Sequence, residues 1–354
     1  MESKKIAVLA GDGIGPEVMR ETIKVLDAVS LKYNLNFKYK YADVGGIAYD
    51  KHGTALPKET LELCENSDAI LFGSVGGPKW ENLPKEKRIE RNSILALRKH
   101  FDFYANLRPA VLYPEMINSS PLKNPPKDGF DIMILRELSG DAYFGKSVLE
   151  DDYAIDEMKY TKQQCKRIAR IAFEIAAKRN NHVTCVDKSN VLSSSILFRN
   201  VVAEVSKNYP QVRLDFLYID NATMQIIKKP NDFDVIVTTN LFGDILSDEA
   251  AMITGSIGML ASASLNEKGL GFYEPAGGTA PDIAGKGIAN PIAQILSAAL
   301  MLKYSFGLDK ASKSIESAVR EVLQAGYRTK DIMESGMKEV GTKEMGDLIA
   351  ERIK

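Results

Sequence analysis

The sequence predicts an α/β protein with a largely parallel sheet. Short apolar runs alternate regularly with longer amphipathic segments along the chain, and this alternation is typical of strand–helix–strand units. The chain has 354 residues, which is enough for about two domains. Its content of 45% hydrophobic and 26% charged residues is ordinary for a soluble globular protein.

Composition also argues against several classes of function. The formal net charge is −1 and the basic residues are scattered, so we expect no nucleic acid and no membrane as a partner. The three cysteines are isolated and lack CxxC spacing, which argues against a disulfide framework or a zinc site. No signal pattern is seen, and the longest apolar helix, near 292–302, is shorter than the roughly 20 residues that cross a bilayer. We therefore expect a cytoplasmic protein.

The chain begins with a strand and a glycine-rich turn. Apolar residues 6–10 predict a buried strand, and GDGIGPE at 11–17 leads into a helix over 16–32. The glycines do not have the spacing of a standard dinucleotide fingerprint, because the third follows the second by two residues rather than three. A tight strand-to-helix turn is therefore a better interpretation than a standard Rossmann fold. Further strands are predicted at 37–43, 69–74 and 130–137, and further helices at 58–65 and 91–101.

The later part of the chain continues the alternation. Residues 138–160 lack a helical period and mix aromatic with charged side chains, so we expect an extended arm or hairpin there. Helices are predicted at 161–179, 194–208, 222–229, 292–306, 311–324 and 343–352, strands at 182–187, 214–219 and 235–237, and a glycine-rich loop at 269–291.

The stretch DVIVTTNLFGDILSD, at 234–248, carries the first candidate site. It turns from a short strand into a helix on which Asp244 and Asp248 share one face. Like charges at this spacing cost about 0.2–0.5 kcal/mol unless something offsets them. A divalent cation such as Mg²⁺ would do so, since hard cations prefer carboxylate oxygens. A helix cap beside a solvated carboxylate explains the stretch equally well.

Other polar residues follow predicted strands. Arg136, Lys188 and Asp220 stand at or just after the carboxyl ends of three of them, and ligands of α/β folds gather at that edge of the sheet. Four such strand ends, counting the one before Asp244, favour a site there.

Candidate roles follow from side-chain chemistry. Arg98, Arg108 and Arg136 suit a small di-acid, because guanidinium groups bind carboxylates in a bidentate manner. Lys188 and Tyr143 are candidate proton handlers. Three alternatives remain open at this point. Arg98 can be solvated surface, Arg108 a turn residue before a proline, and Tyr143 a packed aromatic.

Seven motifs together make the sequence similar to a known family. They are GDGIGPE (11–17), GSVGGPKW (73–80), ANLRPA (105–110), RELSGDAYFG (136–145), VDKSNVL (186–192), NLFGDILSD (240–248) and GTAPDIAGKGIANP (278–291). On these motifs the chain resembles the isocitrate/isopropylmalate dehydrogenase family of β-decarboxylating dehydrogenases. The resemblance implies NAD⁺-dependent oxidation of 3-isopropylmalate with loss of CO₂, giving 4-methyl-2-oxopentanoate in leucine biosynthesis. The alternatives are a D-malate or tartrate dehydrogenase of this family, or a non-catalytic regulatory homologue.

The resemblance also implies site roles. The three arginines bind the substrate carboxylates, Asp220, Asp244 and Asp248 bind Mg²⁺ or Mn²⁺, Lys188 accepts the hydroxyl proton and Tyr143 protonates the enol. Asp220 also borders the substrate, and Glu90, Ile94 and Leu95 face its side chain, with Arg91 competing for the place of Glu90. Nicotinamide contacts are implied for Ser74, Val75, Gly76 and Asn190, and the other cofactor contacts for Ile14, Gly278, Thr279, Ala280, Pro281, Asp282, Ile283 and Asn290. Asp282 would repel a 2′-phosphate, so NAD⁺ is expected rather than NADP⁺.

The family's architecture is implied as well. It consists of two α/β domains with a cleft between them, which is not a standard Rossmann fold. A discontinuous cofactor-binding domain spans 1–103 and 255–354, and a substrate and dimer-interface domain spans 104–254. The active unit is a homodimer in which Lys188 and Asp220 reach the site of the partner subunit, and the arm near 138–160 clasps the partner.

Overall fold

A computed structural model describes residues 3–353 of the chain. The strands of its large sheet are β1 (Lys4–Gly11), β2 (Phe37–Tyr41), β3 (Ala69–Ser74), β4 (Ala105–Leu112), β5 (Phe130–Glu137), β8 (His182–Asp187), β9 (Arg213–Tyr218), β10 (Val235–Thr238), β11 (Ala261–Leu265) and β12 (Gly271–Pro275). The helices are α1 (Gly15–Tyr33), α2 (Gly46–His52), α3 (Lys58–Glu65), α4 (Ile89–Asn92), α5 (Ile94–His100), α6 (Lys162–Ala176), α7 (Ser193–Ser206), α8 (Ile219–Lys228), α9 (Asn240–Ile253), α10 (Ile292–Tyr304), α11 (Asp309–Gln324) and α12 (Thr342–Ile353).

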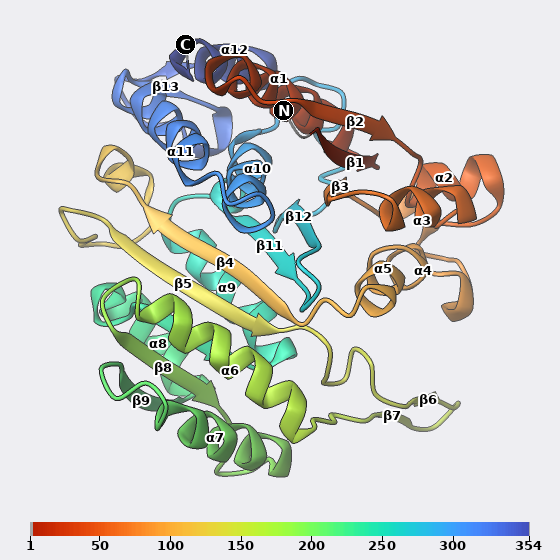
Figure 1. Cartoon of the computed structure of the whole chain (residues 1–354), viewed down its shortest axis with the longest axis vertical. Coiled ribbons are helices and arrows are strands. Elements are labelled where there is room, and N and C mark those ends of the chain that lie inside the picture. Colours follow the sequence, from red (N-terminus) through yellow and green to blue (C-terminus); the bar gives the residue numbers. More distant parts are fainter. Residues whose placement is uncertain (1–2, 354) are drawn as a thin grey trace.

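One ten-stranded sheet runs through the molecule in the order β2-β1-β3-β12-β11-β4-β5-β10-β8-β9. The predicted α/β class is therefore confirmed (Figure 1). Strands β5, β10, β8 and β9 are adjacent and parallel. Their carboxyl ends thus meet at one edge, as the polar strand ends in the sequence predicted. None of the helices within residues 3–353 is both long and apolar enough to cross a membrane.

The centre of the sheet is where the sequence was least informative. Strand β4 is antiparallel to both β5 and β11, and β11 is antiparallel to β12. The glycine-rich loop predicted from residue 269 was wrong over Gly271–Pro275, which forms β12. Pro109 lies within β4, in the part that pairs with β5 alone, since β11 pairs only with Ala105, Asn106 and Leu107. A proline is tolerated where one side of a strand is unpaired.

The helix predicted over 91–101 is divided into α4 and α5. Ser93 lies between them with φ −123° and ψ −87°, which is not a helical conformation. Its hydroxyl donates a hydrogen bond to the carbonyl oxygen of Ile89 at 2.6 Å. A serine that bonds back to the preceding turn competes with the regular helical ladder, and this contact accompanies the break.

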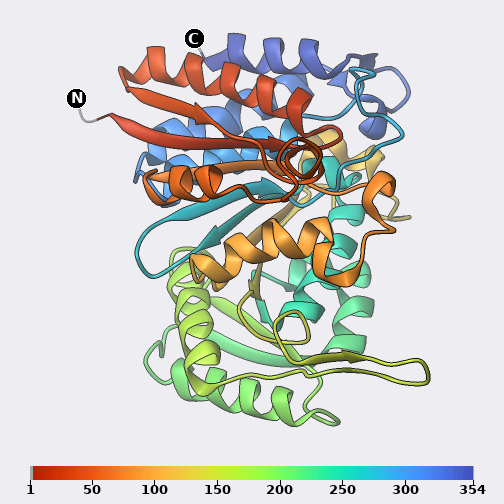
Figure 2. The ribbon, with the colours of Figure 1, turned by 90° about the vertical axis from the view of Figure 1, so that its right-hand side faces the viewer.

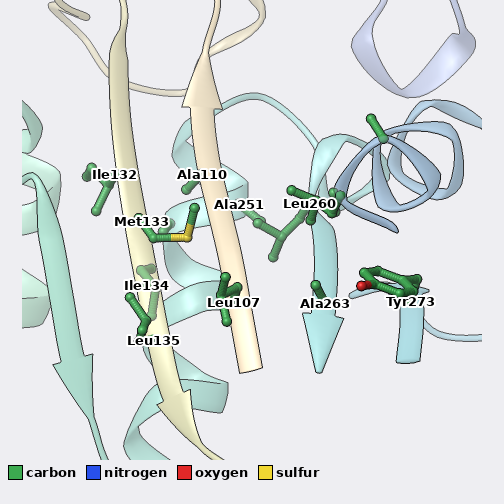
Figure 3. Close-up of a cluster of buried hydrophobic side chains, with 14 of the residues drawn as sticks. Leu107, Ala110, Ile132, Met133, Ile134, Leu135, Ala251, Leu260, Ala263 and Tyr273 are labelled. Atoms are coloured by element: carbon green, nitrogen blue, oxygen red, sulfur yellow. The ribbon is translucent and has the colours of Figure 1, made fainter. Parts of the chain in front are cut away.

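The main core spans the junction between β11 and β4. There, the half of the sheet formed by β2, β1, β3, β12 and β11 meets the half formed by β4, β5, β10, β8 and β9. Leu107, Ile134, Ala263 and Tyr273 are all fully buried and belong to one hydrophobic cluster (Figure 3). The predicted arm is confirmed as a hairpin of β6 (Ser147–Leu149) and β7 (Ala154–Asp156), which projects from the body (Figure 2). The second small sheet pairs β13 (Tyr327–Arg328) with β14 (Lys338–Glu339).

Two leucines of α1 provide a matched test of the core. Leu26 is fully buried, whereas Leu31 on the same helix is 84% exposed. We expect Leu26→Ala to lower the free energy of unfolding by about 2–5 kcal/mol, because it leaves a cavity. Leu31→Ala should change it by less than about 0.5 kcal/mol. Urea unfolding of the two variants measures the difference, and equal losses would contradict this placement of α1.

Candidate active site

The site is built around a carboxylate on α9 and arginines from the neighbouring strands. Arg136, at the end of β5, donates from Nη1 to Oδ1 of Asp244 at 2.5 Å. Nη1 of Arg108, on β4, lies 3.2 Å from the same oxygen and 3.3 Å from Oδ1 of Asp248. A methyl group added at Gly243 would lie 2.8 Å from Cβ of Arg136, so only glycine lets α9 approach β5 so closely.

Arg98 is the third member of this basic group. It is 7% exposed and donates to Oε1 of Glu274, on β12, at 2.7 Å. The interpretation of Arg98 as solvated surface is therefore wrong. Arg108 lies in a strand, not in a turn. The sequence had not indicated Glu274, because nothing in the chain marks a contact across 176 residues.

Asp244 and Tyr143 have complementary protonation states. Burial opposes ionisation of Asp244, but the charges of Arg136 and Arg108 outweigh it and hold its pKa below the ordinary range. The Tyr143 hydroxyl donates to Oδ2 of Asp244 at 2.6 Å. Burial and this carboxylate raise the pKa of Tyr143, so its phenol keeps its proton at neutral pH. Burial and the charge of Arg108 lower the pKa of Arg136 to about 10, which leaves it cationic.

Lys188 and Asp220 form a second group. Nζ of Lys188 donates to Oδ1 of Asp220 at 2.6 Å, and the Asp220 side chain is 62% exposed. The Lys188 hydrogen bond holds the pKa of Asp220 below its ordinary value. Fully buried Asp187 anchors the loop that carries Lys188 by accepting hydrogen bonds from the Ser189 amide and from Arg199.

Within residues 3–353, no three His, Cys, Asp or Glu side chains of a single chain are grouped as a metal site. The structure therefore brings Asp244 and Asp248 together with Arg108 and Arg136, but leaves Asp220 outside that group.

The GDGIGPE motif joins the loops to which cofactor contacts were assigned. The Asp12 carboxylate accepts hydrogen bonds from the amides of Gly46, Ile47 and Gly76. The Ile14 amide donates to the carbonyl oxygen of Thr279 at 2.9 Å. One strand-to-helix turn thus fixes both the 74–77 loop and the start of the 278–291 loop.

A cavity of about 160 Å³ lies beside this turn. Its lining includes five residues that the sequence assigned to the cofactor, namely Ile14, Gly278, Ala280, Ile283 and Asn290. It also includes Ile257, Gln294 and Asp331, which sequence reasoning missed. The Asn290 side chain donates to Oδ2 of Asp331 at 3.0 Å. Of the other assigned positions, Thr279 accepts a hydrogen bond from the Ile14 amide and the Gly76 amide donates to Asp12, whereas Asn190 is exposed in the loop after β8.

Glu90 lies over the loop assigned to nicotinamide. A methyl group added at Gly76 would lie 2.1 Å from Oε1 of Glu90. This contact favours Glu90 over Arg91 for the position facing the site. Ile94 and Leu95 are partly buried on α5, one turn before Arg98.

Comparison with known proteins gives consistent matches over nearly the whole chain. Residues 5–349 match the family described as isocitrate/isopropylmalate dehydrogenase. The chain is 58% identical to 3-isopropylmalate dehydrogenase of Pseudoalteromonas translucida, covering 92% of this chain and 93% of that protein. It is 56% identical to the Campylobacter jejuni protein of the same name, and the match covers 100% of this chain and 99% of that protein.

A solved structure agrees with these matches. The crystal structure of isocitrate dehydrogenase from Methylococcus capsulatus has a TM-score of 0.88 at 33% identity, and the match covers 99% of each chain. With the motifs, the sheet order and the arginine–aspartate group in place, the chain belongs to the isocitrate/isopropylmalate dehydrogenase family.

Proposed function

We propose that the protein is an NAD⁺-dependent 3-isopropylmalate dehydrogenase of leucine biosynthesis. The observation that carries the proposal is the convergence of Arg108, Arg136 and Tyr143 on Asp244. Relatives named 3-isopropylmalate dehydrogenase, at 56–58% identity over nearly the full length, support the substrate. The product is 4-methyl-2-oxopentanoate with CO₂.

The arginines hold the two carboxylates of the substrate. Each guanidinium is a planar donor that binds a carboxylate through two hydrogen bonds. Arg98, Arg108 and Arg136 are all less than a tenth exposed, so a carboxylate among them is shielded from water. Arg98 is already oriented by Glu274. Glu90, Ile94 and Leu95 then meet the isopropyl group, on the side of α4 and α5.

The donor chemistry at the site fits a divalent cation, Mg²⁺ or Mn²⁺. Asp244 and Asp248 offer carboxylate oxygens one helical turn apart, which are ligands that hard cations prefer. By the family resemblance we assign the third protein ligand to Asp220 of the partner subunit. This is consistent with the finding that no third acidic group joins the pair within residues 3–353 of one chain. When bound, the cation supplies Lewis acidity to the hydroxyl and carboxylate oxygens of the substrate.

Two side chains of the protein move the protons. Lys188 of the partner subunit would accept the proton of the substrate hydroxyl, and bound NAD⁺ would supply the hydride acceptor for the carbon that bears this hydroxyl. The carboxylate β to the new ketone leaves as CO₂, and its bonding electron pair remains on the substrate as an enolate. Tyr143 donates its proton to the carbon that has lost CO₂, and this step requires a phenol that is protonated beforehand. The raised pKa of Tyr143 supports this role.

The cavity beside Ile14 fits the adenosine part of NAD⁺. Its walls are apolar and glycine-rich, so the backbone can approach a flat ring closely. Gln294 in its lining is 1% exposed, and neither its Nε2 nor its Oε1 has a hydrogen-bond partner among the described residues. Unmet polar groups of this kind suit a polar ligand. Asp282 would bind the ribose hydroxyls, and Asn290 would lie near the adenine.

Exposed apolar side chains support a homodimer. Five of them lie on helices α7, α8 and α9, namely Ile196, Met224, Ile227, Ile245 and Met252. Four lie on the arm, namely Val148, Leu149, Tyr153 and Ile155. Apolar patches of this kind mark interaction surfaces. We further propose that 1–103 with 255–354 and 104–254 move as two domains whose cleft closes on substrate.

The substrate and the metal are tested in one assay. We expect NADH formation with 3-isopropylmalate to exceed that with D-malate and isocitrate, because Glu90, Ile94 and Leu95 suit an apolar side chain. Excess EDTA should abolish turnover, and Mg²⁺ or Mn²⁺ should restore it. Faster turnover of D-malate would instead favour the related D-malate activity.

The shared active site is tested by mixing two inactive variants. Lys188→Ala and Tyr143→Phe should each lose most activity alone. In coexpressed mixtures, half of the sites in each heterodimer would be intact, so we expect about a quarter of the wild-type rate under random pairing. Mixtures of Asp244→Ala with Tyr143→Phe serve as the control, since both residues belong to the same half-site. No recovery in the first mixture would contradict a site built from two subunits.

Coenzyme choice is tested at one position. NADP⁺ should be used at least about tenfold less efficiently than NAD⁺, because an Asp282 carboxylate would repel the 2′-phosphate. Asp282→Asn removes this negative charge and should narrow the difference between the kcat/KM values for NAD⁺ and NADP⁺. Equal efficiency of the wild-type protein with both coenzymes would overturn the assignment of Asp282.

A further inference from the structure

The base of the arm lies against the start of the helix that carries Asp244. The chain leaves the body after Asp141 and returns to it at Tyr160, and both residues are buried. The Asp141 amide donates to the carbonyl oxygen of Lys159 at 3.1 Å. Asp141 has φ +73°, a left-handed conformation that a non-glycine residue adopts only when its surroundings hold it. The base of the arm is thus a fixed structure.

Tyr160 and Asp141 together supply the N-terminal cap of α9. The Tyr160 hydroxyl donates to Oδ2 of Asp141 at 3.0 Å and accepts from the Asn240 amide at 2.8 Å. The same Oδ2 accepts from the Leu241 amide at 3.2 Å. These amides belong to the first turn of α9, where the helix itself offers no acceptor. Thr239, which precedes the helix, makes no side-chain cap.

The cap continues directly into the active site through one side chain. Asn240 donates from Nδ2 to the carbonyl oxygen of Gly140 at 3.1 Å, and its Oδ1 accepts from Nε of Arg136 at 2.8 Å. Arg136 then reaches Asp244 through Nη1. Two hydrogen bonds therefore separate the Tyr160 hydroxyl from the guanidinium assigned to the substrate. In this series of hydrogen-bonded residues, all members except Asp244 are at least nine-tenths buried.

We propose that Tyr160 is a positioning residue: its hydroxyl fixes the first turn of α9 and, through Asn240, the orientation of the Arg136 guanidinium toward the substrate carboxylate. The inference rests on the proposed function for the role of Arg136. It adds a residue that does not touch substrate, coenzyme or metal. It also means that the base of the arm helps to orient an active-site residue of its own subunit.

Tyr160→Phe tests the proposal, because it removes the hydroxyl and keeps the ring. Tyr273→Phe is the matched control, since Tyr273 is also buried and its hydroxyl bonds to Ser305 at 2.7 Å, away from α9. We expect Tyr160→Phe to raise the KM for 3-isopropylmalate about tenfold and to leave the KM for NAD⁺ within about twofold. Tyr273→Phe should change neither value. An unchanged KM for 3-isopropylmalate in Tyr160→Phe, or equal changes in both variants, would overturn the proposal.

A second measurement separates this inference from the proposed function. Absence of wild-type turnover with 3-isopropylmalate would refute the proposed function. The positioning role would then be judged by hydrogen exchange at the amides of residues 240 and 241. Faster exchange there in Tyr160→Phe than in Tyr273→Phe supports the cap, and equal exchange refutes it. Should Tyr160→Phe not fold, Asp141→Asn replaces it in both measurements, with the same outcomes deciding.

Discussion

The burial of the Arg136 guanidinium is the constraint on which the rest of the site depends. A cation 1% exposed must have its donors matched by acceptors, since an unpaired buried charge is strongly destabilising. The acceptors come from α9, through Asn240 and Asp244. Gly243, on the same helix, allows α9 to lie directly against β5. The position of α9 and the position of the substrate arginine are therefore set by the same contacts.

The Asp244 carboxylate contacts side chains of its own subunit and is also a proposed metal ligand. Its charge is balanced by Arg108 and Arg136, and its second oxygen accepts a hydrogen bond from Tyr143. The same oxygens are those proposed to bind the metal. Substrate carboxylates would then take over the arginines that Asp244 now engages. Within one subunit the three arginines are thus paired with carboxylates, Arg108 and Arg136 with Asp244 and Arg98 with Glu274.

The features that the sequence predicted well are those with local signals. Two local patterns, the i,i+4 spacing of Asp244 and Asp248 and the apolar run that ends in Arg136, correctly predicted that these three residues lie at one sheet edge. β11 was missed because its residues, ASASL, are small, and an alternation of alanine with serine is only a weak strand signal. Glu274, Asp331 and Tyr160 were missed because their importance arises from partners distant in the chain. Such pairings are decided by packing, and no residue type or spacing marks them beforehand.

The pairing of β4 with β11 has a mechanical consequence. Only three residue pairs join these strands, whereas β4 pairs with β5 along eight. Beyond Leu107, β4 therefore belongs to one half of the sheet alone, and Pro109 has no amide hydrogen with which to extend the ladder. The domain motion proposed above would bend the sheet at this short junction and leave the longer β4–β5 ladder intact. The sheet is continuous in its hydrogen bonding, but the ladders at its middle are short, with three pairs between β4 and β11 and two between β12 and β3.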